Sequence, residues 1–467
     1  MKLRITFLAL GLLAVFVSTA QPGKQESVLP FEYVPNRLLL KFRDSALPTG
    51  WQNGKIVNAH PLLVQLNPSR AQVMDLIDVI VLDFDRPVSV PNLVRFVAGH
   101  PDVEFAEPDG IARIAWTPND PNFLNNNQYG PRKIDAEPAW DVWRGDDNFI
   151  IAILDTGVQS NHSDLNGKFV TGYNYIANNS NAEDDHGHGT HVAGIASANT
   201  NNGVLMAGIC PMGKIMSVKV CNSGGSCSWN GMASGVTFAM ANGAHVINMS
   251  ITGSGGSATL ATALTLAHNN GVLTIAAAGN NGSSSSNFYP ANYPEVIAVA
   301  ASNNTPTNNK WQWSNYGNWV DVAAPGENIF STWRFDSTNW LSGTSMASPH
   351  VAGAALLLYS KLVELPAQRS MATALQVRTL LETTTDPVND TLLGSYVRTG
   401  KINLNRALRS ILLDGDINGD GCVNDTDLAI ILERFGQSGP NRADRNSDGV
   451  VDDTDLAIVL SQFGQGC

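Results

Sequence analysis

The sequence predicts an α/β fold for the largest part of the chain, with a doubly wound, mostly parallel sheet. Short, uninterrupted apolar runs alternate there with helical stretches, a pattern typical of strands that are buried on both faces. The expected strands are 149–154, 215–220, 245–250, 272–278 and 296–300, and helices are expected at 232–242 and 260–269. In such a sheet the active site lies at the carboxyl ends of the strands.

A smaller α+β unit is expected before this region, in residues 21–115. Apolar runs at 37–42 and 78–84 predict strands, and a helix is expected at 88–98. The Pro- and Asn-rich segment 116–123 predicts an exposed boundary between the two regions.

The length of the chain indicates more than one domain, and its charge argues against nucleic-acid binding. The 467 residues exceed one ordinary domain. The 29 Lys and Arg against 41 Asp and Glu give a net charge of −12, so the chain has no basic surplus for binding nucleic acid. Residues 413–467 hold eleven acidic residues and three Arg, and therefore carry −8 of that charge. Such a segment repels itself unless cations neutralise it, which indicates metal binding.

The N-terminus has the pattern of a secretory signal peptide, which we assign to residues 1–20. Lys2 and Arg4 precede an uncharged apolar run at 5–17, and small residues follow at 18–20. The alternative is a membrane anchor, but the run is shorter than the ~20 apolar residues of a membrane span. We expect a secreted protein without a membrane span in its mature form.

Export would permit disulfide bonds. The five cysteines are Cys210, Cys221, Cys227, Cys422 and Cys467. Cys221 and Cys227 could close a short loop, and Cys422 could tie down the C-terminus with Cys467. Cys210 would then remain unpaired, although five cysteines do not fix the connectivity.

Three segments of the α/β region contain the groups that an activated serine needs. Asp155 ends an apolar strand, His188 begins the segment HGTHVAG, and Ser345 lies in GTSMASPH. A serine hydroxyl becomes nucleophilic when an imidazole accepts its proton, and a carboxylate holds that imidazole in one tautomer. Each segment alone could also be a turn or a helix cap.

A site for a developing oxyanion is expected beside Ser345. An apolar helix is expected at 346–362, with Pro349 in its first turn, so the backbone N–H of Ser345 would lie at a helix N-terminus. Asn280, at the end of another strand, is the candidate for a second donor, although asparagine there is often a turn residue.

The three segments, in the order Asp, His, Ser, resemble the signature motifs of the subtilisin-like serine proteases, the subtilases. The resemblance covers about residues 116–410 and is strongest to the thermitase branch, through WTPNDPNF, QYGPRKIDAEPAWD and LDTGVQSNHSDL. It implies a serine endopeptidase domain with Asp155, His188 and Ser345 as the triad and Asn280 in the oxyanion hole. His186, His191 and His350 match no catalytic position.

The resemblance also implies a groove in which the substrate backbone adds as a strand. One wall resembles the family's at Ser250, Ile251 and Gly253, the other at Ser223, Gly224 and Gly225, and Phe288 falls near the floor of the S1 pocket. Thr252 stands where the family usually has glycine. The floor residue suggests small or medium P1 side chains.

Residues 21–115 resemble the inhibitory propeptide of the family, through segments 35–42 and 101–108. Such a propeptide acts as a folding template and is removed by the enzyme itself. We expect that cleavage near residues 115–117.

The thermitase-like segments imply a structural Ca²⁺ site made of oxygen ligands. The implied ligands are the side chains of Asp120, Asp164 and Asn202 and the carbonyls of Asn199, Val204 and Met206. The alternative is that Asp120 and Asn202 are solvated loop residues. A further calcium site of that branch lacks its ligand types here, because Asn174, Ala177, Asn179 and Asn181 replace them.

The acidic C-terminal segment contains an internal repeat, which indicates two copies of one structural unit. The segment 416–427, followed by a helix expected at 428–435, returns 28 residues later as 444–455 and 456–463. The oxygen ligands and the central glycine follow the loop of an EF-hand. The expected ligands are Asp416, Asn418, Asp420, Cys422, Asn424 and Asp427, and then Asp444, Asn446, Asp448, Val450, Asp452 and Asp455, with Cys422 and Val450 acting through their carbonyls.

An Asp at the last loop position and the lack of a preceding helix resemble a type I dockerin, so residues 413–467 are expected to form a small all-α, calcium-binding dockerin-like domain. A dockerin docks onto a cohesin on a scaffold or cell surface, and Asp425-Thr426 and Asp453-Thr454 occupy its partner-reading positions. Without metal this segment should fold poorly. The alternative is an acidic, disordered tail.

Together these patterns predict a secreted, monomeric, calcium-dependent serine endopeptidase that processes itself and acts on proteins or peptides. The alternative is a catalytically inactive, calcium-dependent adhesion or scaffold protein. A lipase or esterase of the α/β-hydrolase fold is excluded, because its triad runs Ser, Asp, His around a G-x-S-x-G elbow.

Overall fold

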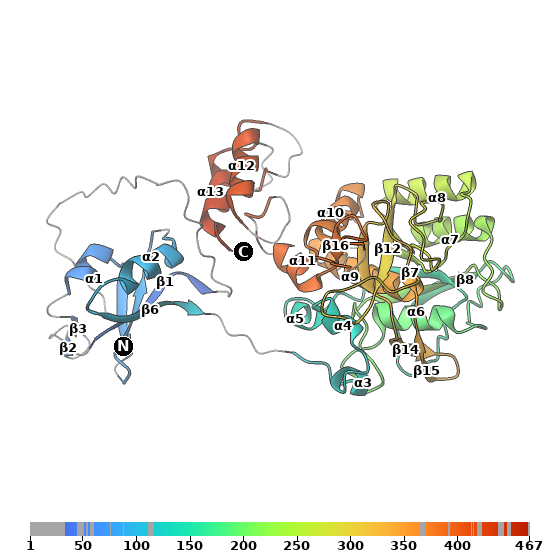
Figure 1. Cartoon of the computed structure of the whole chain (residues 1–467), viewed down its shortest axis with the longest axis horizontal. Coiled ribbons are helices and arrows are strands. Elements are labelled where there is room, and N and C mark those ends of the chain that lie inside the picture. Colours follow the sequence, from blue (N-terminus) through green and yellow to red (C-terminus); the bar gives the residue numbers. More distant parts are fainter. Residues whose placement is uncertain are drawn as a thin grey trace. The chain divides into compact units, whose positions relative to one another are not determined.

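The computed structural model describes residues 33–43, 51–52, 55–56, 60–74, 76–86, 88–110, 116–363, 369–390, 393–411, 413, 415–417, 423–437, 443–445 and 450–465 (Figure 1). The chain divides into two compact units, one of residues 114–422 and one of residues 1–113 with 423–467. The expected signal peptide lies outside the described residues. Within those residues, no helix is long and apolar enough to cross a membrane.

The larger unit is built on an eight-stranded sheet in which every neighbouring pair of strands is parallel. In spatial order its strands are β16 (Gly400–Lys401), β13 (Val322–Pro325), β12 (Val296–Ser302), β11 (Leu273–Ala277), β10 (Val246–Met249), β7 (Ile150–Asp155), β9 (Lys214–Lys219) and β8 (Phe169–Asn174). The predicted fold class is confirmed, and the five apolar runs all contain strands of this sheet.

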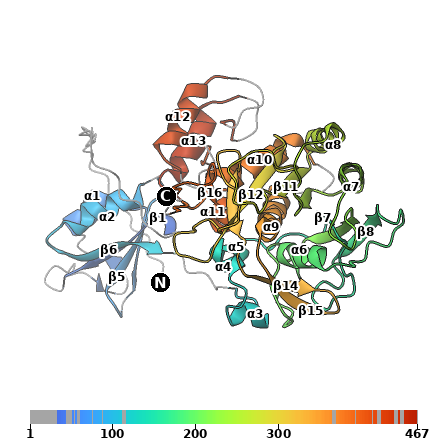
Figure 2. The same cartoon turned by 45° about the vertical axis from the view of Figure 1, so that its right-hand side comes forward.

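Helices cover both faces of the sheet, as in a doubly wound fold (Figure 2). Ile151 and Ile153 of β7 face one core, whereas Ala152 and Leu154 face the other. The first core contains α6 (His188–Ser197), α9 (Thr344–Leu362), α10 (Met371–Thr383) and α11 (Leu404–Ile411); the second contains α7 (Trp229–Ala241) and α8 (Ala258–Asn269). The sheet is therefore buried on both faces, which explains its continuous apolar runs.

Shorter elements complete this unit. Three short helices precede the sheet: α3 (Pro121–Leu124), α4 (Gly130–Lys133) and α5 (Ala136–Trp140). The antiparallel hairpin of β14 (Ile329–Trp333) and β15 (Ser337–Leu341) packs on α6 and leads directly to α9.

Helix α9 differs from the prediction at its start. It begins at Thr344, two residues earlier than expected, so Pro349 lies in its second turn rather than its first. Proline has no N–H for the carbonyl four residues earlier, which is that of Ser345. The hydroxyl of Ser250 donates to this carbonyl instead, at 2.7 Å.

The N-terminal part of the smaller unit is an α+β fold, as expected. Its antiparallel sheet has the order β4 (Arg70–Met74), β5 (Val79–Asp83), β1 (Tyr33–Phe42) and β6 (Val103–Gly110). Helices α1 (Pro61–Leu66) and α2 (Val90–Ala98) pack with it, and β2 (Trp51–Gln52) and β3 (Lys55–Ile56) form a separate pair. Alternate residues of β1, Leu38, Leu40 and Phe42, are buried in its core.

The C-terminal part contains the two repeated helices, α12 (Asp425–Arg434) and α13 (Asp453–Gln462), which pack against each other. Each begins with a capping box, formed by Asn424 with Asp427 and by Asp452 with Asp455. In the described residues the sequence repeat thus corresponds to two helices that begin with the same capping arrangement.

Candidate active site

The end of β7 and the start of α6 bring Asp155 and His188 together. Asp155 is the last residue of β7 and is buried, and His188 is the first residue of α6. The Nδ1 atom of His188 lies 2.8 Å from Asp155 Oδ1 and 3.0 Å from Oδ2. The backbone N–H of Thr156 also donates to Oδ1, at 2.7 Å. The contact with Asp155 leaves the other ring nitrogen, Nε2, to accept a proton.

The electrostatic balance at His188 favours its protonated form more than usual. Burial lowers the pKa of His188, but the charge and hydrogen bond of Asp155, together with the charge of Asp184, raise it, and the pKa lies above its ordinary value. An imidazole with a raised pKa is a stronger acceptor for the proton of a nucleophile.

Asp184, which the sequence analysis missed, organises the turn before α6. Its carboxylate accepts hydrogen bonds from the hydroxyls of Thr156 and Thr190 and from three backbone N–H groups, those of His186, Gly187 and Thr190. Burial raises the pKa of Asp184, but these bonds outweigh it and the pKa lies below its usual value. The sequence shows an aspartate four residues before the motif histidine, but it does not show that this carboxylate is buried and bonded to the turn.

Ser345 is the second residue of α9, which packs against α6. Its hydroxyl donates to the carbonyl of Ser250 at 3.1 Å, and the hydroxyl of Ser250 donates to the carbonyl of Ser345. Among the described residues the hydroxyl of Ser345 has no hydrogen bond with His188. Bonds between a nucleophile and its base often tighten only when substrate binds.

Two hydrogen-bond donors remain available beside Ser345. The Oδ1 atom of Asn280 accepts from the backbone N–H and from the hydroxyl of Thr344, both at 2.8 Å. These bonds fix the orientation of the amide, and its Nδ2 group has no acceptor in the described part of the chain. The backbone N–H of Ser345 lies in the first turn of α9, where helices leave such groups unpaired. Both could bind an oxyanion.

Comparison with known families decides the class of protein. The family model described as Subtilase family, Peptidase S8, matches residues 146–436, which is more than half of the chain. The chain belongs to the subtilase family. In this subtilase a second family model, the Dockerin type I domain, matches residues 414–463.

Relatives agree with the assignment. Thermitase from Thermoactinomyces vulgaris is 45% identical over 294 residues, which are 63% of this chain and 100% of that protein. The thermophilic serine proteinase of Bacillus sp. (strain AK1) is 41% identical over 315 residues, 68% of this chain and 75% of that protein. A solved protease structure from Pseudoalteromonas arctica PAMC 21717 matches with a TM-score of 0.56 at 31% identity, covering 63% of this chain and 99% of that chain. This subtilase is therefore a subtilisin-like serine endopeptidase with a dockerin domain.

Two other histidines of the subtilase motifs, His191 and His350, are held by backbone carbonyls. His191 places Nε2 3.1 Å from the carbonyls of both Ile329 and Asn339, and Nδ1 of His350 lies 2.8 Å from the carbonyl of Met346. Burial lowers the pKa of His191 to about 3 and that of His350 to about 4, so both rings stay neutral near pH 7. Both support the structure rather than exchange protons.

One wall of the expected substrate groove follows β10. Both the N–H and the carbonyl of Gly253 are paired with Tyr289, at 2.8 and 2.9 Å, so this backbone is already occupied. Thr252 is exposed, and its N–H and carbonyl have no hydrogen bond in the described part of the chain. Within the described residues Thr252 thus has a backbone edge that a substrate backbone could pair with, and the sequence analysis noted this residue only as a departure from glycine. Ile251 packs on the second core.

The other expected wall, with Ser223, Gly224 and Gly225, lies in the segment after β9, where all three residues are exposed. Cys221 and Cys227 form a disulfide across it. Cys210 is a buried free thiol, and burial raises its pKa to about 11. The expected Cys422–Cys467 pair lies outside the described residues. Phe288 is half-buried and stacks on Trp319, with ring centroids 6.4 Å apart.

The residues implied for a calcium site surround two buried carboxylates. Asp120 and Asp164 are both 0% exposed and form no ion pair with Lys or Arg in the described part of the chain. The backbone N–H groups of Asn201 and Asn202 donate to the carboxylate of Asp120. The side-chain Nδ2 group of Asn202 and the backbone N–H of Met206 donate to that of Asp164. Burial raises the pKa of Asp164 to about 7 and also raises that of Asp120. These carboxylates thus lack a cationic partner.

The carbonyls assigned to the same site are also available. Among the described residues the carbonyl oxygens of Asn199, Val204 and Met206 accept no hydrogen bond, whereas that of Leu205 accepts two from Asn122. Carboxylates and free carbonyls together are the ligand set that Ca²⁺ prefers. The residues present therefore fit a calcium ion.

The loop that lacks the ligands of a further calcium site is held by an asparagine. The Oδ1 atom of Asn174 accepts from the N–H groups of Ile176 and Ala177, and its Nδ2 group donates to the carbonyl of Asn181 at 2.7 Å. Asn179 pairs with Asn174 through the backbone. Neutral hydrogen bonds therefore hold this loop.

Part of the predicted dockerin ligand set can be described. Asp427 and Asp455 are buried and lie in the first turns of their helices, and Asp452 caps α13. Asp416 accepts from the hydroxyl of Ser410 at 2.6 Å. Asn424, Asp444 and Val450 are also described; Asn418, Asp420, Cys422, Asn446 and Asp448 lie outside the described residues.

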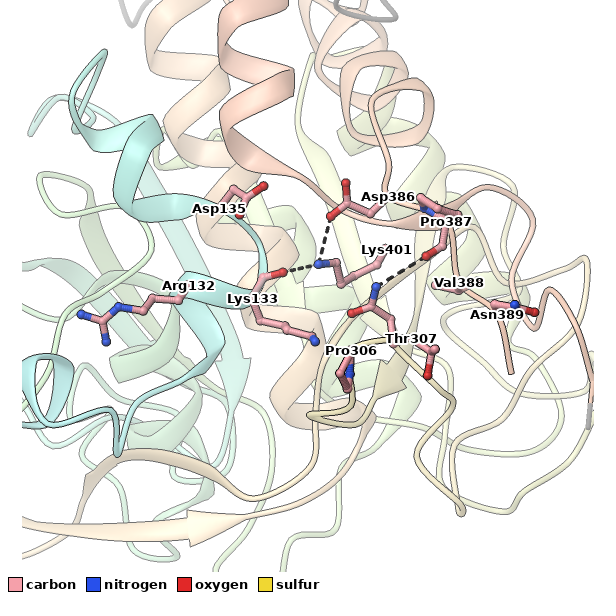
Figure 3. A pocket seen from close by; sticks show the side chains of 11 residues that line it. Arg132, Lys133, Asp135, Pro306, Thr307, Asp386, Pro387, Val388, Asn389 and Lys401 are labelled. Carbon is pink, nitrogen blue, oxygen red and sulfur yellow. Dashed lines mark hydrogen bonds and ion pairs between the residues drawn. The ribbon is translucent and has the colours of Figure 1, made fainter. Parts of the chain in front are cut away.

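The larger unit also contains a cavity of about 690 Å³ (Figure 3). None of the proposed triad residues lines this cavity. Its side chains come from the α4–α5 turn, loop 306–308, segment 386–389 and β16. Lys401 pairs with Asp386 at 3.0 Å and donates to the carbonyl of Lys133. Because its charges are largely matched within the protein, we interpret it as a structural ion network.

Proposed function

We propose that this subtilase is a secreted, calcium-dependent endopeptidase that cleaves its own propeptide and is attached through its dockerin domain. The observation that carries the proposal is the contact of His188 with Asp155 beside two unpaired donors, Asn280 Nδ2 and Ser345 N–H. These are the parts that acyl transfer from a peptide bond needs.

In the first half of the reaction the hydroxyl oxygen of Ser345 attacks the scissile carbonyl carbon, and Nε2 of His188 takes the hydroxyl proton. Asp155 stabilises the resulting imidazolium and fixes its orientation. The negative charge that develops on the carbonyl oxygen is bound by Asn280 Nδ2 and by the N–H of Ser345. His188 then gives its proton to the leaving amine, which frees the amine and leaves an acyl-enzyme.

In the second half, water donates a proton to His188 as its oxygen attacks the acyl carbon. The same donors stabilise the second oxyanion, and His188 returns the proton to Ser345 as the acid product leaves. The substrate backbone would lie along Thr252, opposite the loop that contains Ser223.

We assign the structural calcium to Asp120, Asp164, Asn202 and the three free carbonyls. The ion would neutralise two buried carboxylates, so its role is to stabilise the loop of residues 199–206 and not to take part in the reaction.

The segments outside the peptidase domain fit a secreted proenzyme. The folded α+β unit within residues 21–115 corresponds to an inhibitory propeptide, with cleavage near residues 115–117. The dockerin domain suggests a cohesin-type partner, and relatives with these domains typically act outside cells. The signal-like residues 1–20 support the same location.

The test is to express the chain without residues 1–20 and to treat it with a fluorophosphonate, with calcium or with EDTA. We expect label on a shortened species of roughly 35–40 kDa, at ~110 Da per residue, and none in a Ser345→Ala control. EDTA should reduce the label. Folded, calcium-loaded protein that takes no label would overturn the proposal and favour the inactive adhesion protein.

A further inference from the structure

The loop between Cys221 and Cys227 is held by its disulfide and by hydrogen bonds within the loop itself. Residues 222–226 are all exposed, small or polar, and contribute no apolar side chain to either core of the sheet. Asn222 bonds to the N–H groups of Gly224 and Ser226 through its side chain, both at 3.0 Å. The loop must therefore be ordered by these local bonds and by the disulfide, since burial does not order it.

This loop begins beside the backbone of Asp155, the proposed catalytic aspartate. The backbone N–H groups of Val220 and Cys221 both donate to the carbonyl of Asp155, at 2.9 and 3.1 Å. At its far end the loop faces the histidine segment, because a Cβ added at Gly225 would lie 3.7 Å from His186 Nε2.

The segment after the loop reaches the opposite wall. Ser228 caps α7, and the ring of the next residue, Trp229, packs on Gly253, where an added Cβ would lie 3.1 Å from it. In the sheet, β9 and β10 flank β7, so the segments that follow them stand on either side of Asp155. A peptide strand lying between these walls must contact the disulfide-bridged loop.

We propose that the Cys221–Cys227 disulfide is a specificity determinant, which holds one wall of the groove ready to pair with extended peptides. The inference rests on the proposed function. Without the bridge, the exposed loop would have to be ordered whenever a peptide binds, and that cost would weaken binding. A substrate too short to reach the loop would not be affected, and neither would the reacting groups.

The bridge can be opened without changing the remainder of the chain. A thiolate of a dithiol reagent attacks the sulfur of Cys227, which is only half-buried, and Cys221 leaves as a thiolate. The second thiol of the reagent closes its own disulfide and releases Cys227, so two electrons pass to the protein and both sulfurs end as thiols.

The test compares two substrates on the mature chain, with and without dithiothreitol. One is a peptide amide of at least five residues, and the other an ester of a single blocked amino acid. Cys210, Cys422 and Cys467 are replaced by Ala or Ser in the background, so that only one bridge can respond. We expect reduction to raise KM for the peptide about tenfold, with kcat and the ester kinetics within about twofold. A Cys221→Ser/Cys227→Ser variant should show the raised KM with or without dithiothreitol.

The outcomes are distinguishable. Equal losses on ester and peptide, or a falling rate of fluorophosphonate labelling, would show that the bridge supports the catalytic groups and would overturn the inference. An unchanged KM for the peptide in the reduced parent would also overturn it. If the oxidised parent cleaved neither substrate, the proposed function would fail and this inference with it.

Discussion

The end of the sheet at Asp155 and the region of Asp120 and Asp164 contain equally buried carboxylates, but the partners of these carboxylates differ. Asp155 has His188 and the N–H of Thr156 as partners. Among the described residues Asp164 has only the side-chain amide of Asn202 and one backbone N–H as partners, and burial raises the pKa of Asp164 to about 7. The protein itself supplies the partners of the Asp155 carboxylate, whereas the carboxylates of Asp120 and Asp164 could still bind a cation. Substitutions at the first should therefore change rate, and those at the second should change stability.

The largest effect is expected for Asp155→Asn. The asparagine would keep the shape of the side chain but could hold the wrong tautomer of His188, so kcat should fall about 10⁴-fold. The melting temperature, measured by calorimetry on the same protein, should change little. A large loss of stability with a small loss of rate would reverse the comparison.

Replacement of Asn280 by Ala should have a smaller effect. Removal of one of two oxyanion donors costs about 10²–10³-fold in kcat. KM should stay nearly constant, because the bond is made mainly in the transition state. Thr344 loses its acceptor in this variant, so Thr344→Val is the matched control and should retain most of the rate. An equal loss of kcat in Thr344→Val would mean that the effect comes from a shift of helix α9 and not from the lost oxyanion donor.

The Asp164→Asn variant tests the other region. A ligand at 100 times its Kd stabilises the folded state by about 2.7 kcal/mol, so loss of the site should lower the free energy of unfolding in calcium by a similar amount. The rate below the melting transition should be unchanged. Asn174→Ala, in the loop that an amide holds, is the matched control, and its response to EDTA should equal the parent's. Asp427→Ala and Asp455→Ala in every chain remove the contribution of the dockerin domain.

The smallest effect concerns pH. Activity requires neutral His188, whose pKa is raised, so activity should rise with pH through a midpoint above 6.5. In Asp155→Asn the larger of the two charge effects that raise the pKa of His188 is gone, so the midpoint of the residual activity should move to lower pH. Measured kcat/KM between pH 5 and pH 9 would check the direction. A midpoint that stays in place would mean that another group controls the limb.

The sheet could be predicted because each buried strand carries its own signal. The runs around Ile151 and Val299 are apolar without interruption, and no contact from elsewhere was needed to recognise them. The two-residue strand β16 and the hairpin β14–β15 could not be found in this way, since their pairing depends on segments far away in the sequence.

At the site, the sequence named Asp155, His188, Ser345 and Asn280 through motifs, and the structure places them at the ends of strands and the starts of helices. It could not reveal that Tyr289 occupies the backbone of Gly253, or that Asp184 holds the turn before α6. Both depend on hydrogen bonds between loops, which leave no periodic pattern. The free carbonyls at Asn199, Val204 and Met206 are likewise a property of the folded backbone.

The proline in α9 accounts for one of two hydrogen bonds between Ser345 and the segment that leads to Thr252. Because Pro349 cannot bond to the carbonyl of Ser345, Ser250 does so, and Ser345 donates back to Ser250. Ser250 belongs to the same short segment that offers Thr252 to a substrate. The backbone that leads to Thr252 and the residue proposed as nucleophile are therefore joined by two reciprocal hydrogen bonds.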